Sequence, residues 1–251
     1  MNILISNDDG INAIGIKLLA EELTKLGHVT VVAPDRERSA TGHAITIHNP
    51  LRVEKIENYY KQINAWSVNG TPGDCVKIAV ESILNQKPDL VVSGINNGPN
   101  LGSDVLYSGT VSAAMEGSIQ GIPSIAISLA DFGDKMNYEG AAKYSCKLVN
   151  IIMKKLKNNK GLFNVNVPSA SMEDIKGIKF THLGIRKYED NYVKRQDPMG
   201  RNYYWLSGRL VKTENKEESD IGAIEKNFIS ITPLHYDLTD YDFLKKLNNT
   251  K

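Results

Sequence analysis

Two adjacent carboxylates, Asp8 and Asp9, follow an apolar run of strand length near the start of the chain. Neighbouring carboxylates repel each other unless a proton or a cation lies between them. A divalent cation resolves that conflict, and all-oxygen ligands suit hard ions such as Mg²⁺, Mn²⁺ or Ca²⁺. Aspartate is also common at turns and helix starts, so the pair by itself is equally consistent with a structural role.

Two further loops carry neutral oxygen donors that could complete such a site. Ser39 and Asn96 each follow another apolar run, close to the point where a buried strand is expected to end. Because ligands of open parallel sheets bind beyond the carboxyl ends of the strands, the three loops should meet at one edge. The sequence therefore predicts a divalent cation held by Asp8, Asp9, Ser39 and Asn96, with coordination positions left for water and substrate.

A glycine-rich segment, residues 98–103, leads toward Ser108, Gly109 and Thr110 at the start of an expected helix. The free N–H groups and the positive dipole of a helix start, together with two hydroxyls, favour an anion. An ordinary helix cap is the alternative, and it is the commoner meaning of an isolated Ser-Gly-Thr. Beside a metal site, we expect a phosphate pocket formed by these three residues and Asn96.

His43 lies four residues after Ser39 and is a candidate proton donor or phosphate contact. A structural histidine, hydrogen-bonded near the loop, is an equally good interpretation. Other chemistries lack their signatures, because the chain has no G-x-G-x-x-G fingerprint, no P-loop and no G-x-S-x-G elbow. An NAD enzyme and a P-loop NTPase are therefore disfavoured.

The elements needed to position these residues alternate between short apolar runs and helical periodicity over residues 1–185. Strands alternating with helices indicate a mostly parallel sheet with right-handed crossovers. We therefore expect an α/β fold, a three-layer Rossmann-like core over these residues. A short strand is also expected over residues 44–53.

Residues 186–251 differ in character and are expected to form a C-terminal extension of the same domain. Its expected parts are a hairpin with arms at residues 202–206 and 209–212 joined near Ser207-Gly208, a returning strand at residues 228–232, and a terminal helix at residues 241–247.

The composition excludes several classes of partner. A net charge of +1 over 251 residues lacks the strong basic excess of a sequence-independent nucleic-acid binder. The two cysteines, Cys75 and Cys146, have no metal-ligand spacing and are expected to be buried thiols. The amino terminus has no signal-peptide pattern, and no stretch approaches the roughly 20 apolar residues of a membrane span. We expect a cytoplasmic protein with no membrane and no nucleic-acid polymer as partner.

Short motifs along nearly the whole chain resemble those of the SurE family, the survival-protein nucleotidases. The stretch at residues 2–10, which contains Asp8 and Asp9, is similar to the opening of that family. Further similar segments are residues 32–35, 38–40, 69–72, 92–100, 107–111, 113–117, 164–168, 197–201 and 230–234.

The resemblance implies a phosphatase acting on nucleoside 5′- and 3′-monophosphates, in some relatives also on short polyphosphate. It implies one divalent cation per subunit, Mg²⁺ or Mn²⁺, on the same four residues. It also implies a homodimer or a dimer of dimers in which the C-terminal hairpin is exchanged, so that residues 192–212 serve assembly.

The expected mechanism is direct attack by water on phosphorus, with Asp8 or Asp9 orienting the water. A covalent aspartyl-phosphate is the alternative, although the D-x-D spacing of such phosphatases is missing. Two competing functions use the same pocket or fold: a non-enzymatic nucleotide or phosphate sensor, and a glycosyltransferase with an Asp-rich metal site.

Overall fold

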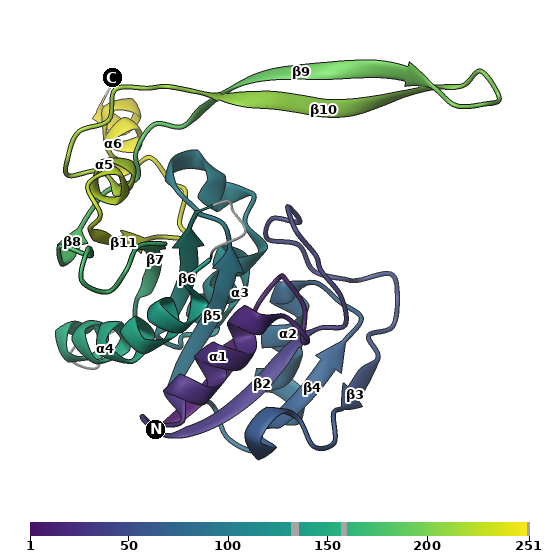
Figure 1. Ribbon diagram of the computed structural model, residues 1–251, viewed down its shortest axis with the longest axis vertical. Helices are drawn as coiled ribbons and strands as arrows, with labels where there is room; N and C mark the ends of the chain where they lie inside the picture. Colours follow the sequence, from purple (N-terminus) through teal and green to yellow (C-terminus); the bar gives the residue numbers. More distant parts are fainter. Residues whose placement is uncertain (132–135, 157–159, 250–251) are drawn as a thin grey trace.

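A computed structural model of the chain describes residues 1–131, 136–156 and 160–249 (Figure 1). Its centre is a nine-stranded sheet in the order β3-β4-β2-β1-β5-β6-β7-β11-β8. From β4 to β7 all neighbouring strands run parallel, whereas β3 and β11 run antiparallel to β4 and β7. The strands are β1 (Asn2–Ser6), β2 (His28–Pro34), β3 (Val53–Lys55), β4 (Asn64–Val68), β5 (Leu90–Asn97), β6 (Ser124–Ala130), β7 (Leu162–Pro168), β8 (Ile178–Phe180) and β11 (Ile229–Leu234).

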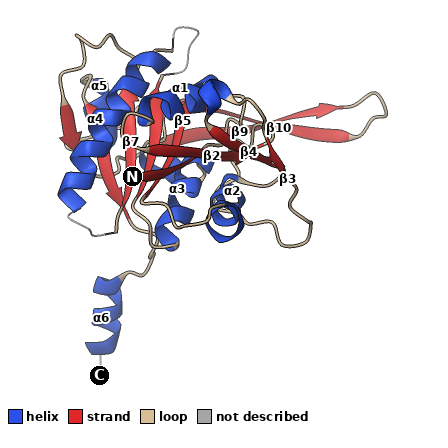
Figure 2. Cartoon of the chain, turned by 90° about the horizontal axis from the view of Figure 1, so that it is seen from below, coloured by secondary structure: helices blue, strands red, loops and turns tan. Residues whose placement is uncertain are grey.

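Helices cover both faces of this sheet (Figure 2). α1 (Ile14–Leu23) and α4 (Tyr138–Leu156) lie on one face, and α2 (Pro72–Ile78) and α3 (Gly109–Ile119) lie on the other. A hydrophobic cluster under each helix pair joins it to the sheet, which places the core between layers. The three-layer α/β prediction is therefore confirmed.

The start of α2 illustrates how local sequence sets these boundaries. Pro72 occupies the first turn, where its missing N–H is not needed. The hydroxyl of Thr71 accepts from the backbone of Asp74 at 3.1 Å, and the carboxylate of Asp74 accepts from the backbone of Thr71 at 2.8 Å. This reciprocal capping box begins the helix at Pro72.

The strand expected over residues 44–53 is wrong, because only Val53 belongs to a strand. The backbone of this segment is bound by side chains instead of by a neighbouring strand. Asp74 accepts hydrogen bonds from the Thr46 N–H at 2.9 Å and from its hydroxyl at 2.6 Å. The Ala44 carbonyl accepts from Thr71. Side-chain partners of this kind compete with a strand ladder for the same groups.

The C-terminal hairpin is longer than predicted and turns at a different place. Its arms are β9 (Lys187–Gln196) and β10 (Asn202–Val211), which pair antiparallel over their whole length and project from the body (Figure 1). Ser207, expected at the turn, lies within β10 opposite Asn191. The turn forms at Asp197, whose carboxylate accepts from the backbone of Met199 and of Arg201, both at 2.9 Å.

After the hairpin the chain returns to the main sheet. α5 (Asp220–Glu225) precedes β11, which inserts between β7 and β8; the short β8 was not predicted. The terminal helix α6 (Tyr241–Asn249) extends away from the body in Figure 2 and has no buried residue. Within the described ranges, no helix has both the length and the apolar character that crossing a bilayer requires.

Candidate metal and phosphate site

The loop after β1 is held in a tight turn that presents two carboxylates at the carboxyl edge of the sheet. The Asn7 amide donates to the Gly10 carbonyl at 2.9 Å, and Gly10 has a φ of +93° that favours glycine. The Ile11 N–H then donates to the Pro34 carbonyl at 2.8 Å, which ties the turn to the end of β2. The loop therefore fixes the backbone on both sides of Asp8 and Asp9.

Asp8 is buried against the start of α3. Its Oδ1 accepts a hydrogen bond from the Thr110 hydroxyl. A Cβ on Gly109 would lie 2.7 Å from the Asp8 Cβ, so only glycine allows this approach. Burial raises the pKa of Asp8, and hydrogen bonds from Thr110 only partly oppose that effect. The two predicted features, the aspartate pair and the helix start, are thus in direct contact.

Asp9 lies on the side of β5. Its Oδ2 accepts from the Asn97 N–H at 3.2 Å. Burial, followed by repulsion from Asp8, raises the pKa of Asp9 to about 6. The negative charges of both carboxylates are therefore disfavoured. A cation bound between them would stabilise the two ionised forms.

Asn96 is the next-to-last residue of β5, directly before Asn97, whose N–H binds Asp9. The register of β5 against β6 shifts between Gly94 and Asn96, which redirects the end of the strand. The side-chain amide of Asn96 donates to the Gly98 carbonyl at 2.9 Å. That bond orients the amide group, and the side-chain oxygen is not used by it.

Ser39 lies near the site because the preceding residue, Arg38, is hydrogen-bonded to Asp8. The Arg38 N–H donates to the Asp8 carbonyl at 2.8 Å, which brings the loop after β2 against the loop after β1. The Ser39 hydroxyl is exposed and donates to Glu37 at 2.6 Å. Among the described residues, no hydrogen bond joins the Ser39 side chain to Asp8 or Asp9.

Glu37 is a residue that the sequence analysis missed. Its charge adds a small contribution to the raised pKa of both Asp8 and Asp9, so the loop after β2 brings a third carboxylate near the pair. The available signal was an acidic residue in a loop already assigned to the site.

The start of α3 combines an occupied cap with a backbone donor. The Ser108 hydroxyl accepts from the Val111 N–H at 3.1 Å, so it is the helix cap. The Thr110 hydroxyl is bound to Asp8. The Thr110 backbone N–H is also hydrogen-bonded to Asp8. Among the described residues, the Gly109 N–H has no such partner, so it is the backbone donor that this end of the helix offers to an anion.

A buried amide cluster, also missed from the sequence, supports the glycine-rich loop before α3. The backbone of Asn100 donates to Asn166 at 2.9 Å, and its carbonyl accepts from Asn164 at 2.7 Å and from Asn166 at 2.9 Å. Its side chain donates to Ser128 at 2.8 Å. These bonds anchor the loop to β6 and β7.

His43 is placed on the flank of α3. Its Nε2 lies 3.0 Å from Oε2 of the buried Glu116, and this contact is the main cause that lowers the pKa of Glu116. The pair ties the loop that follows Ser39 to the middle of the helix.

The donor set fits a hard cation. Asp8 and Asp9 supply two carboxylates whose ionised forms are disfavoured by burial, and the buried Oδ1 of Asn7 has no hydrogen-bond partner. No group of three His, Cys, Asp or Glu side chains with metal-binding geometry occurs in the described part of the chain. A cation here would therefore depend on two carboxylates plus neutral oxygens, which suits Mg²⁺ or Mn²⁺ better than zinc.

The fold and this edge define a class: a three-layer α/β protein with a paired-carboxylate site facing a helix start. Comparison with known proteins narrows the class. The family model described as Survival protein SurE matches residues 3–190, so the chain belongs to the SurE family.

Relatives cover almost the full length. A protein of Alkaliphilus metalliredigens named 5′-nucleotidase SurE is 52% identical over 251 residues, which is 99% of this chain and 98% of the relative. One of the same name from Gloeobacter violaceus is 53% identical over 241 residues, 95% of this chain and 91% of the relative. The crystal structure of the SurE protein from Aquifex aeolicus superposes with a TM-score of 0.83 at 43% identity, covering 99% of this chain and 98% of that one.

Proposed function

We propose that the chain is a metal-dependent phosphatase, a 5′-nucleotidase that hydrolyses nucleoside 5′- and 3′-monophosphates to nucleoside and phosphate. Short polyphosphate is a further substrate of the same site. The observation that carries the proposal is the contact of Asp8 with Thr110 and Gly109. This contact places a carboxylate pair that favours a bound cation directly beside a helix start that favours a bound anion. The relatives named 5′-nucleotidase SurE support the choice of substrate.

The residues proposed to hold the cation are Asp8, Asp9, Ser39 and Asn96. Mg²⁺ or Mn²⁺ bound there would supply positive charge beside the phosphoryl group. Asp8 is held by Thr110, and Asp9 is held by the Asn97 N–H. For Ser39 to take part, its hydroxyl must exchange its hydrogen bond to Glu37 for a contact with the cation.

In the proposed reaction, the Gly109 N–H binds a phosphoryl oxygen at the start of α3, between Ser108 and Thr110. The Asn96 side chain contributes to the same pocket. Asp9 orients a water molecule, whose oxygen attacks phosphorus while the bond to the ester oxygen breaks. One proton of that water stays on the released phosphate and the other passes to the ester oxygen, so the nucleoside leaves as an alcohol. The fixed dipoles of the helix start stabilise charge on the phosphoryl oxygens without reorganisation.

The hairpin is proposed to assemble a homodimer or a dimer of dimers. Both of its faces carry large exposed hydrophobic side chains, including Tyr192, Trp205, Leu206 and Leu210. An apolar surface of this kind, far from the body, is typical of a region covered by another chain.

A phosphate-release assay with AMP tests the enzymatic proposal against the sensor and the glycosyltransferase. We expect turnover with Mn²⁺ or Mg²⁺ and none with excess EDTA. Nucleotide binding without phosphate release would favour a sensor, and turnover of sugar nucleotides alone would favour a glycosyltransferase. The proposal fails if purified wild-type protein releases phosphate equally well in EDTA.

A further inference from the structure

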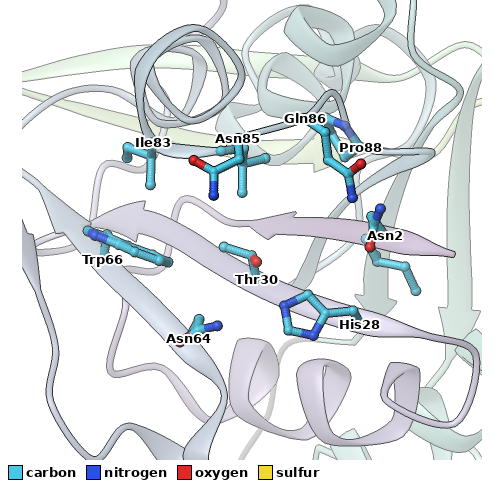
Figure 3. A pocket seen from close by; sticks show the side chains of 11 residues that line it. Asn2, His28, Thr30, Asn64, Trp66, Ile83, Asn85, Gln86 and Pro88 are labelled. Atoms are coloured by element: carbon cyan, nitrogen blue, oxygen red, sulfur yellow. The ribbon is translucent and has the colours of Figure 1, made fainter.

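The opposite edge of the sheet holds a separate cavity of about 200 Å³ between the amino ends of β1, β2 and β4 and the loop before β5 (Figure 3). Figure 3 shows Thr30 and His28 along its floor and Trp66 at one end. Asn85 and Gln86 point toward the floor from the other side. The loops of the candidate catalytic site follow the carboxyl ends of the strands, so the two sites do not share residues.

The floor of this cavity has unusual composition for its place in the fold. In a parallel sheet covered by helices, inward positions are expected to be apolar. On β2, Val32 and Thr30 are two residues apart and lie on the same face of the sheet. Val32 packs into the hydrophobic core, whereas Thr30 lines the cavity. Thr30 is 6% exposed, and no hydrogen bond joins its hydroxyl to another described residue. Because this hydroxyl is open to the cavity and is not sealed in the core, a ligand there can bind it in exchange for water.

The roof is shaped by an irregular helix. After α2 the chain makes a π-helical turn, Ala79–Ile83, in which the Leu84 N–H donates to the Ala79 carbonyl at 2.9 Å. Such turns are rare and often lie at functional sites. This one ends directly before Asn85 and Gln86, so it places their amides over the cavity.

The lining has a definite chemical character. It contains the Trp66 indole, the His28 imidazole and no Asp, Glu, Lys or Arg, and its side-chain amides are those of Asn2, Asn64, Asn85 and Gln86. The flanking charged residues are engaged elsewhere, because Lys87 donates to the Gln120 carbonyl and Asp89 accepts from the Asn2 backbone. An indole face stacks on flat rings, and side-chain amides pair with the donor and acceptor edges of bases. The absence of Lys and Arg from the lining disfavours a phosphate group here.

We propose that this cavity binds an uncharged heteroaromatic molecule, a nucleobase or nucleoside. Its volume lies below the ~300–1,000 Å³ of sites for drug-sized ligands, which suits a small ring system. Trp66 stacks on the ring, Thr30 and the amides bind its edge, and the ligand carries no phosphate. The proposal concerns binding alone and stands whether or not the chain is a phosphatase.

Isothermal titration calorimetry in EDTA, with adenosine, guanosine, uridine and adenine as separate ligands, tests the proposal. We expect saturable binding of at least one of them, and a saturable change in Trp66 fluorescence in Trp205→Phe protein. Replacing Thr30 by Val keeps the shape but removes the hydroxyl and should weaken binding about fivefold to tenfold. Thr181→Val, at a similarly buried threonine outside the cavity, should leave the affinity unchanged.

Three results would overturn the proposal. They are no saturable binding of any of the four ligands, equal affinity in the Thr30→Val and wild-type proteins, and loss of binding in Asp9→Asn, which would place the ligand in the candidate catalytic site. Thermal unfolding checks that Thr30→Val is folded. If it is not, Asn85→Ala on the exposed loop replaces it and must weaken binding by a similar factor.

Discussion

The carboxyl edge of the sheet and the β9–β10 hairpin depart from ordinary globular structure in opposite ways. At the edge, polar groups such as Asp8, Asn100 and Thr110 are buried. On the hairpin, apolar groups such as Trp205 and Leu206 are exposed by more than 60%. In the first arrangement Thr110 binds Asp8 and Asn100 binds Ser128, whereas the second leaves its apolar atoms in water.

This difference indicates what each region lacks. In the described part of the chain, a buried and a half-buried carboxylate, both with raised pKa values, have no positive charge beside them, and the apolar hairpin has no surface covering it. A small ion can satisfy the first without any change in chain association. Only another folded surface can satisfy the second. Variants of the carboxyl edge should therefore change activity or metal binding without changing assembly. Variants of the hairpin should change assembly without changing activity.

The largest effect is expected at Asp9. Replacing Asp9 by Asn removes the carboxylate proposed to orient water and to bind the cation, so kcat should fall by about 100-fold or more. Phosphate release from AMP at saturating Mn²⁺ measures this. Asp242→Asn on α6 is the control, and the oligomeric mass should not change in either variant. Turnover within a few fold of wild type would remove Asp9 from the mechanism.

The next effect concerns stability without metal. Burial raises the pKa of Asp9 from 3.8 to about 6, so the folded state holds this proton more tightly than the unfolded state. The destabilisation is absent below about pH 4 and complete above about pH 6, and two pKa units correspond to about 3 kcal/mol. In EDTA, the free energy of unfolding of wild type should therefore fall relative to that of Asp9→Asn as the pH rises from 4 to 7.

Urea unfolding at both pH values provides the measurement. The raised pKa of Asp8 is present in both the wild-type and the Asp9→Asn protein, so its effect on stability largely cancels in the comparison. A difference between the two proteins that does not vary with pH would contradict the electrostatic account of the site.

A smaller effect is expected on the hairpin. Trp205→Lys places a charge on the exposed apolar face and should raise the dissociation constant of the assembly about 30-fold, as for loss of an interface hot spot. Light scattering after size-exclusion chromatography over a range of concentrations measures this, with Lys143→Ala on α4 as the control. An unchanged mass at every concentration would show that this residue lies outside the interface.

The smallest effect is expected at Thr110. Thr110→Val removes the hydroxyl that binds Asp8 and should weaken Mn²⁺ affinity about tenfold, while Thr110→Ser should restore it. Calorimetric titration with Mn²⁺ tests both variants. Equal affinity in the Val and Ser variants would mean that the hydrogen bond does not position the carboxylate.

Much of the fold followed from periodicity, because buried parallel strands are continuous apolar runs and helices carry apolar stripes. The same logic located the candidate site, since it only asks which polar residues follow each run. The structure brings Asp8, Thr110 and the segment at Asn96–Asn97 together. Whether they bind a metal stays a prediction.

Features that depend on contacts between distant residues were not predictable in this way. The approach of Glu37 to the aspartates and the amide cluster at Asn100 join separate loops. The hairpin turn was misplaced because Ser207-Gly208 is a common turn sequence, whereas the actual turn depends on the Asp197 carboxylate. The segment near Thr46 was wrongly predicted as a strand because its partner, Asp74, is 28 residues away.

The insertion of β11 between β7 and β8 has a consequence for biosynthesis. β11 is made after the hairpin and α5, yet it forms the antiparallel neighbour of β7 inside the sheet. While a ribosome is still translating the hairpin, β7 has an open edge that can pair with a nascent chain nearby. The last step of folding must therefore wait until translation has passed Leu234, so a stalled or truncated product is expected to be prone to aggregation.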